Sequence, residues 1–211
     1  MKKIRLNKKH KTEKSKKWLL RHINDEYLQR SKKEGYRSRS AYKLKQINEK
    51  FKIFNDVKTV LDLGAAPGGW SQIASEFTEK NSIIVGVDKL LIKPLKNVYF
   101  IKTDINDNNF SEAISKYFSE KVDLIVSDMA PNTTGHAVAD HLRIINLVEL
   151  ALSIANKYLK KSGFFVCKVF QGGAQGELLN KMNNNFREIK YFKPNASRRE
   201  SSETYLIGKK K

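Results

Sequence analysis

A chain of 211 residues is long enough for one α/β domain and too short for two ordinary domains with linkers. Its hydrophobic content of 40% and aromatic content of 10% exclude a chain that is disordered throughout. Lys and Arg, 41 in all, outnumber 22 Asp and Glu and leave a formal net charge of +19, which predicts a polyanionic partner. Because no apolar run approaches the ~18 residues that a spanning helix needs, we expect no membrane partner.

The beginning of the chain is strongly basic and shows almost no apolar periodicity. We expect a flexible basic arm over residues 1–17, without the apolar block of a secretory signal, and one domain over residues 18–211. The only cysteine, Cys167, lies in the apolar run FFVCKVF. Disulfides within the chain are therefore excluded, and we expect this side chain to pack in the core.

Two short helices are predicted at the start of the domain. Apolar residues recur at helical spacing over Trp18–Leu28, and a polar break follows at Ser31–Gly35. A second helix is predicted from Ser40, whose hydroxyl can cap it, to Phe51.

The rest of the chain alternates short apolar strands with amphipathic helices. This alternation predicts an α/β fold of the Rossmann-like type, with a mostly parallel sheet covered by helices on both faces. The expected strands are Thr59–Leu63, Ser82–Val87, Val98–Ile101, Val122–Ser127, Gly163–Phe170, Phe186–Phe192 and Thr204–Ile207. The expected helices are Gly69–Phe77, Ser111–Phe118, Ala139–Leu159 and Gln175–Asn183.

The segment VLDLGAAPGGWSQIA joins a strand, a loop of small residues and a helix start, which predicts a ligand site at the carboxyl edge of the sheet. Gly64, Gly68 and Gly69 would let backbone approach a ligand closely. Asp88 ends the next strand, where a carboxylate can accept hydrogen bonds from two ribose hydroxyls. The spacing is not that of the NAD fingerprint and the loop lacks a phosphate-binding Lys, so S-adenosylmethionine is favoured over NAD and ATP. A glycine-rich structural turn is the alternative.

Charged residues also follow three later strands. Asp104, Asp128 and Lys168 stand at strand ends that line one crevice in an open α/β sheet. A lysine in an apolar strand needs a partner or a function, and the candidate carboxylates are Asp128 and Glu203. If the last strand runs antiparallel to its neighbours, Glu203 lies beside Lys168; otherwise it is an ordinary surface residue.

These segments together resemble the FtsJ-like ribose 2′-O-methyltransferases, also called the RrmJ or RlmE group. The similarity extends from about Ser15 to Gly208 and includes the strings VLDLGAAPGGWSQ, VGVD, SDMAPNTTG, FFVCKVFQG and KPNASRRESSETYLI. It implies a seven-stranded sheet whose last strand is antiparallel. It also implies a catalytic tetrad, which falls on Lys43, Asp128, Lys168 and Glu203. The residues expected to bind the cofactor are Gly64, Pro67, Gly68, Gly69, Trp70, Asp88, Asp104, Ile105 and Asp128.

The resemblance implies methylation of a ribose 2′-hydroxyl, expected on a uridine of large-subunit ribosomal RNA. The segment from Lys17 to Leu44 and the strings DLGAAPGGWSQ and SDMAPN are closer to the ribosomal branch than to the tRNA branch. The alternatives are a tRNA or mRNA-cap 2′-O-methyltransferase and a non-catalytic RNA-binding factor of ribosome assembly. We expect a monomer in the cytoplasm, with a mitochondrion, another organelle or the nucleolus as alternatives.

The expected reaction converts S-adenosylmethionine to S-adenosylhomocysteine and needs no metal, because the sulfonium methyl is already activated. Lys168 would act on the 2′-hydroxyl in one of two ways. As a neutral amine it removes the proton, or as an ammonium, the form that nearby carboxylates favour, it orients the hydroxyl and stabilises the developing oxyanion.

RNA phosphates would meet a basic rim around the crevice, and an ordinary solvated face is the alternative for part of that charge. The residues expected in this rim are Lys32, Lys33, Arg37, Arg39, Lys193, Arg198 and Arg199. The string GHAVADH, with His136 and His141 around Asp140, is interpreted as a loop leading into a helix and not as a metal site.

Overall fold

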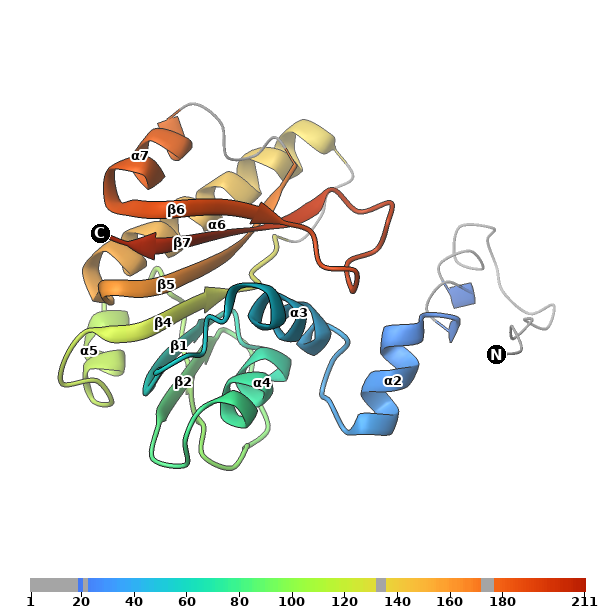
Figure 1. The fold of residues 1–211 in the computed structure, drawn as a ribbon, viewed down its shortest axis with the longest axis horizontal. Helices are drawn as coiled ribbons and strands as arrows, with labels where there is room; N and C mark the ends of the chain where they lie inside the picture. Colours follow the sequence, from blue (N-terminus) through green and yellow to red (C-terminus); the bar gives the residue numbers. More distant parts are fainter. Residues whose placement is uncertain (1–18, 21–22, 132–135, 172–176) are drawn as a thin grey trace.

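The computed structural model describes residues 19–20, 23–131, 136–171 and 177–211 (Figure 1). The arm predicted over residues 1–17 and Trp18 lie outside the described residues. Within those ranges, no helix combines the length and the apolar character needed to cross a membrane.

A seven-stranded sheet forms the centre of the molecule, with the strand order β3-β2-β1-β4-β5-β7-β6 (Figure 1). Strands β1 to β5 pair in parallel, whereas β7 is antiparallel to both of its neighbours. This arrangement confirms the predicted fold class and the antiparallel last strand. The strands are β1 (Thr59–Leu63), β2 (Ile83–Asp88), β3 (Tyr99–Lys102), β4 (Val122–Ser127), β5 (Leu159–Phe170), β6 (Phe186–Phe192) and β7 (Glu203–Lys210).

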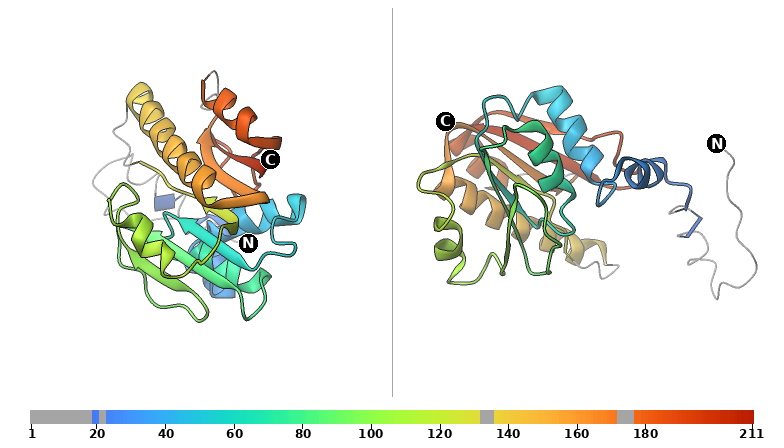
Figure 2. Two further views of the ribbon diagram at one scale, coloured as in Figure 1. Left: turned by 90° about the vertical axis from the view of Figure 1, so that its left-hand side faces the viewer. Right: turned by 90° about the horizontal axis from the view of Figure 1, so that it is seen from below.

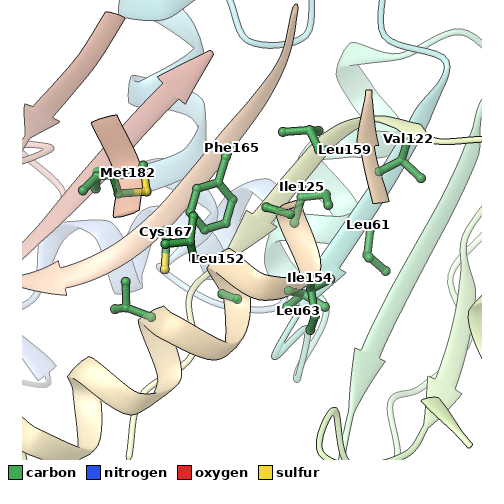
Figure 3. Packing of buried hydrophobic residues seen from close by; sticks show 14 of the residues in the cluster. Leu61, Leu63, Val122, Ile125, Leu152, Ile154, Leu159, Phe165, Cys167 and Met182 are labelled. Atoms are coloured by element: carbon green, nitrogen blue, oxygen red, sulfur yellow. The ribbon is translucent and has the colours of Figure 1, made fainter. Parts of the chain in front are cut away.

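Helices cover both faces of this sheet (Figure 2). Side chains alternate along a strand, so Val60 of β1 packs with α3 and α4 on one face, while Leu61 and Leu63 pack with α5 and α6 on the other. Figure 3 shows part of the second cluster, in which Leu61 and Phe165 of the sheet lie on the face that the helix carrying Leu152 covers. Each fully buried Leu or Phe stabilises the fold by about 1.5–3 kcal/mol. The helices are α2 (Glu26–Glu34), α3 (Ala41–Phe51), α4 (Gly69–Phe77), α5 (Phe110–Ser115), α6 (Ala137–Tyr158) and α7 (Glu177–Asn185).

The first helix of the domain differs from the prediction. The chain breaks at Asp25, whose side chain caps α2 by accepting a hydrogen bond from Leu28 N at 3.2 Å. Helix α2 then continues through the polar residues that were predicted to end it, because the buried Ser31 hydroxyl donates to Leu28 O at 2.9 Å. It ends at Gly35, which adopts the left-handed conformation with φ 78°. The predicted break at Ser31–Gly35 is therefore wrong.

Other predicted boundaries shift as well. Ser40 precedes α3 but makes no capping hydrogen bond, since its hydroxyl pairs with that of Ser38 at 2.6 Å. Strand β5 begins at Leu159 instead of Gly163, because Leu159 already pairs with Val122 of β4. The helices predicted near residues 111–118 and 175–183 are observed at Phe110–Ser115 and Glu177–Asn185.

Candidate active site

The carboxyl ends of the parallel strands open onto a cavity of about 690 Å³. This volume is in the range of small-molecule sites. The cavity is lined by Gly64, Ala66, Val87, Asp88, Lys89, Leu90, Thr103, Asp104, Ile105, Asn106, Asp128, Met129, Ala130, Pro131, Arg143, Asn146 and Leu147. Five of the residues predicted to bind the cofactor are therefore brought together: Gly64, Asp88, Asp104, Ile105 and Asp128.

The glycine turn after β1 forms one wall of the cavity. Gly64 has φ +74°, and a Cβ atom there would lie 2.4 Å from Met129 Cγ, so a larger residue would strain the backbone and close this wall. At Gly69 a Cβ would lie 2.4 Å from Ser38 Oγ. Close packing within the protein therefore explains the glycine at position 69. Neither Gly69 nor its neighbour Gly68 lines the cavity.

Trp70 lies in the hydrophobic core and not along the cavity. Its side chain is 2% exposed, packs with the α3 and α4 cluster, and donates from Nε1 to Ser40 O at 2.9 Å. Pro67 also lies outside the lining. The polar tip of Trp70 is thus used to hold the start of α3 against α4.

Asp88 and Asp104 present carboxylates to the cavity. Asp88 is oriented by Ala66 N, which donates to Oδ2 at 2.9 Å, and by Leu90 N, which donates to Oδ1 at 2.8 Å. Lys89, 2.7 Å from Asp104, holds the pKa of that carboxyl below its usual range, with help from the backbone of Asn106. Two oriented acceptors with the apolar side chains of Leu90 and Ile105 beside them fit a nucleoside, whose hydroxyl and amino groups are donors.

Beside Asp128, two amines and two carboxylates converge. Lys168 Nζ donates to Asp128 O at 2.7 Å and to Oδ1 at 3.0 Å, and lies 3.9 Å from Glu203 Oε2. Lys43 Nζ lies 2.7 Å from Oε1 and 2.8 Å from Oε2 of Glu203. The side chains of Lys168, Asp128, Lys43 and Glu203 are 8%, 17%, 12% and 13% exposed. They are therefore shielded from bulk water, where ion pairs are weak.

The antiparallel course of β7 brings this group together. Glu203 at the start of β7 pairs with Phe170 at the end of β5, so the glutamate reaches the edge at which Lys168 and Asp128 stand. The sequence analysis expects Glu203 beside Lys168 if the last strand is antiparallel, and this expectation is confirmed. The resulting order of charges, amine and acid in alternation from Lys43 to Asp128, leaves no like charges adjacent.

Tyr205 belongs to the same group and was missed by the sequence analysis. It is fully buried, and its hydroxyl donates to Asp128 Oδ1 at 2.7 Å. The available signal was its position two residues after Glu203, on the same face of a strand. Ser197 was also missed; its hydroxyl donates to Glu203 Oε1 at 2.8 Å.

The environment of Asp128 favours its ionised form. Burial raises its pKa, but the ammonium groups of Lys168 and Lys43 and the hydroxyl of Tyr205 together outweigh burial and leave that pKa lowered. Burial and the charge of Asp128 raise the pKa of Tyr205, so this hydroxyl stays protonated and acts as a donor. Asp128 is thus a fixed anion shared by the cavity and the lysine cluster.

Most of the predicted basic rim is engaged within the protein. Arg37 donates to the carbonyls of Lys93 and Pro94, both at 2.6 Å, and so ties the loop after β2 to the segment before α3. Arg39 bonds Asp25 at 2.6 Å and also Ala196 O.

Of the other residues predicted in the rim, two bind groups of the protein and three are exposed. Arg198 reaches Asp25 at 3.5 Å, and Lys193 Nζ donates to the carbonyls of Arg199 and Ser201. The exposed side chains in the predicted set are Lys32 and Lys33 on α2 and Arg199.

No group of three or more His, Cys, Asp or Glu side chains suited to a metal ion occurs in the part of the chain that the structure describes. His136 and His141 flank the first turn of α6, in which Asp140 lies. A carboxylate in the first turn is stabilising at a helix N-terminus, so the predicted helix start is confirmed, while residues 132–135 of the predicted loop lie outside the described residues.

Residues 36–211 match the family model described as FtsJ-like methyltransferase. The chain belongs to this family. The match covers the cavity, the lysine and carboxylate cluster and all seven strands. The family resemblance inferred from the sequence motifs is thereby confirmed.

Similar proteins agree with this assignment over most of their length. "Ribosomal RNA large subunit methyltransferase E" from Rickettsia felis is 47% identical over 204 residues, covering 94% of this chain and 90% of the relative. The protein of the same name from Acidiphilium cryptum is also 47% identical, covering 97% of this chain and 89% of the relative. A crystal structure described as a ribosomal RNA methyltransferase from Plasmodium falciparum superposes with TM-score 0.73 and 31% identity, covering 83% of this chain and 98% of that one. The FtsJ-like chain therefore shares both sequence and fold with these relatives.

Proposed function

We propose that this FtsJ-like methyltransferase moves the methyl group of S-adenosylmethionine to a ribose 2′-hydroxyl, that of a uridine, in large-subunit ribosomal RNA. The observation that carries the proposal is the position of Asp128. It lines the cavity that fits a nucleoside and at the same time holds Lys168 at 2.7 and 3.0 Å. The lysine proposed to act on the hydroxyl is thus held by a residue that lines the proposed cofactor cavity.

S-adenosylmethionine supplies an activated methyl group on a sulfonium and leaves as S-adenosylhomocysteine. In the proposed site, Asp88 accepts from the ribose hydroxyls, and Asp104 and Ile105 hold the adenine end. The turn at Gly64 and the carboxylate of Asp128 face the methionine part. Methyl transfer from a sulfonium needs no Lewis acid, so the proposal includes no metal.

The protein's own contribution is alignment and control of one proton. Lys168 Nζ has three N–H donors as an ammonium. Asp128 accepts two of these hydrogen bonds, and Glu203 at 3.9 Å is too far to accept the third. The third donor is available for the 2′-oxygen of the substrate, so we favour Lys168 as the cation that orients the hydroxyl and stabilises the developing oxyanion. The hydroxyl proton then leaves late in the reaction.

Glu203 and Lys43 would position the ribose. Their mutual distance of 2.7 Å and the hydrogen bond from Ser197 fix the carboxylate before substrate binds. Holding the reacting oxygen in line with the methyl group can supply more of the rate than the proton transfer, which typically contributes about 10²–10⁴-fold. The reactive 2′-hydroxyl itself selects RNA over DNA.

Ribosomal RNA is favoured as the substrate because relatives named for the large ribosomal subunit share 44–47% identity over nearly the whole chain. Those relatives are bacterial, so we place the reaction in the cytoplasm, where ribosomal subunits assemble. An idle RNA-binding factor is disfavoured, because selection for binding alone does not require a complete cluster of Lys43, Asp128, Lys168 and Glu203.

The test is methyl transfer from labelled S-adenosylmethionine to RNA taken from cells with and without this protein, with ribosomal RNA, tRNA and capped mRNA assayed side by side. We expect label in the large-subunit RNA of the deficient cells, on a 2′-oxygen. Lys168→Ala should abolish turnover and leave cofactor binding, measured by calorimetry, nearly intact. Near-normal turnover in that variant, or label confined to tRNA, would contradict the proposal.

A further inference from the structure

A second basic surface lies at the opposite edge of the sheet from the candidate active site, on the left side of Figure 1. Strands β1, β4, β5 and β6 begin at this edge and β7 ends there. The pairings Val122 with Leu159, Phe164 with Lys209 and Phe186 with Lys210 bring these strand ends to one level. We call this surface the basal edge. Its cationic residues are Lys58, Lys121, Lys157, Lys160, Lys161, Arg187, Lys209, Lys210 and Lys211.

Acidic side chains neutralise only part of this charge. Lys160 is paired with Asp123, and Arg187 lies 3.8 Å from Glu188. Lys58, Lys121 and Lys161 are exposed lysines of the same edge. Positive charge therefore accumulates at the beginnings of three adjacent strands.

Two of these cations, Lys210 and Lys121, are close enough to repel each other. Lys210 Nζ is held at the end of α6 by the carbonyls of Ala155 and Asn156, at 3.1 and 2.6 Å. Burial lowers the pKa of Lys210, and the charge of Lys121 lowers it further. A bound anion would relieve this repulsion.

A hollow with aromatic walls adjoins the basal edge. It has a volume of about 280 Å³ and is lined by Ile114, Ser115, Phe118, Ser119, Glu120, Lys121 and Tyr158. Lys157 Nζ lies 5.0 Å from the centre of the Tyr158 ring. Aromatic faces beside cations are the arrangement on which unpaired bases stack while their phosphates are neutralised.

We propose that the basal edge is a second RNA-binding surface, whose lysines contact phosphates while the hollow between Phe118 and Tyr158 accepts an unpaired base. This inference rests on the proposed function, since it assigns a second contact to the same RNA substrate. Strand β4, which runs beside β5 from the basal edge towards Asp128, spans roughly 17 Å from Val122 to Ser127 at about 3.3 Å per residue. The RNA segment on the basal edge is therefore separate from the nucleotide that is methylated.

The charge test compares two double variants of the full chain on transcribed large-subunit ribosomal RNA. Lys121→Gln with Lys161→Gln removes charge from the basal edge. Lys80→Gln with Lys96→Gln removes the same charge from exposed positions just before β2 and β3, which lie at the other end of the strand order from β5 and β7. Each lost phosphate contact makes the slope of log affinity against log salt shallower by about 0.7–0.9, so the basal variant should lose about 1.4–1.8. The control variant should keep the wild-type slope, and both should keep the wild-type kcat at saturating RNA.

The hollow is tested by Phe118→Leu, which removes the aromatic ring and keeps an apolar side chain, with thermal unfolding as the check of folding. We expect RNA affinity to fall by about 5-fold or more, because stacking on an aromatic side chain contributes that much or more per base. Phe77→Leu, at an exposed aromatic residue of α4 on the other face of the sheet, is the matched control and should leave affinity unchanged.

Equal slopes in both double variants, or unchanged affinity in a folded Phe118→Leu variant, would overturn the inference. Failure of the proposed function has a different signature, since the wild-type protein would then bind RNA without transferring any methyl group to it.

Discussion

The hydroxyl of Tyr205 donates to Oδ1 of Asp128 at 2.7 Å, the same oxygen that accepts from Lys168 Nζ at 3.0 Å. Two donors on one oxygen fix the rotamer of the carboxylate and help to keep it ionised. The neutral and fully buried Tyr205 thus helps to set the position of Lys168. We therefore expect Tyr205 to act on the proposed reaction through Asp128.

Replacing Tyr205 by Phe should therefore lower kcat without unfolding the protein. The ring remains in its buried site, and one hydrogen bond to a charged group is lost, which costs about 1.5–3 kcal/mol. We expect kcat to fall by about 10-fold or more, since 1.4 kcal/mol corresponds to tenfold. Single-turnover methyl transfer measures this. The control is Tyr117→Phe, at a tyrosine that packs against the core and lies far from Tyr205 in the sequence. Equal losses of kcat in both variants would contradict a role through Asp128.

Much of this arrangement follows from local patterns in the sequence. Short apolar strands that alternate with helices, together with the glycine turn at Gly64, predict both the sheet and the cavity edge, because parallel strands place their carboxyl ends together. The pairing of Glu203 with Lys43 is not local: the two residues are 160 positions apart, and only the antiparallel course of β7 brings them together. From the residues alone, Glu203 is an ordinary surface glutamate.

Hydrogen bonds that no pattern encodes explain the remaining differences. The charges of Arg37 and Arg39 are visible in the sequence and predict RNA contacts, whereas the carbonyls of Lys93 and Ala196, which these side chains bind, are visible only in the structure. Ser31 was read as a helix breaker because its bond to Leu28 O is satisfied only after the helix forms.

Lys43 and Glu203 should be strongly coupled in a double-mutant cycle. The single variants Lys43→Met and Glu203→Gln each leave a shielded charge without its partner, so the double variant should cost much less than the sum of the two. We expect a coupling of about 1–3 kcal/mol in kcat/KM for RNA. The exposed pair Lys181 and Glu149, 3.0 Å apart, is the control and should couple by less than about 0.5 kcal/mol. Coupling as small as in the control would show that the two residues act independently.

Arg37→Ala should weaken cofactor binding and leave the RNA interaction intact. Its guanidinium holds the carbonyls of Lys93 and Pro94, and this loop carries Leu90, which lines the cavity. We expect KM for S-adenosylmethionine to rise about 10-fold, the equivalent of 1.4 kcal/mol, with an unchanged salt slope of RNA binding. Lys33→Ala on the exposed face of α2 should do the reverse: an unchanged cofactor KM and a salt slope shallower by about 1. A shallower salt slope of RNA binding in Arg37→Ala would show that Arg37 contacts RNA phosphates after all.

Asp62 predicts a pH dependence of stability that opposes the usual behaviour of carboxylates. It is 1% exposed, it accepts from Ser71 Oγ at 2.6 Å, and its Oδ1 has no hydrogen-bond partner among the described residues. Burial raises its pKa from 3.8 to about 7, and the charges of Asp128 and Asp88 act in the same direction. In the unfolded chain the group ionises near pH 4, whereas in the folded chain it keeps its proton up to about pH 7. The folded state thus binds more protons in this window, so stability falls as pH rises through it.

Asp62→Asn should remove this loss, because the amide has no proton to release. The stability of the variant relative to wild type should increase with pH by about 2–3 kcal/mol between pH 5 and pH 8, at about 1.4 kcal/mol per pKa unit. Urea unfolding at a series of pH values measures the free energy of unfolding of both proteins. Any constant cost of the buried amide lowers the stability of the variant equally at every pH and does not change the dependence on pH. Asp56→Asn at an exposed position is the control. A relative stability of Asp62→Asn that stays flat across this range would mean that Asp62 is ionised in the folded protein at pH 5, and that its charge is stabilised within the core by groups other than Ser71.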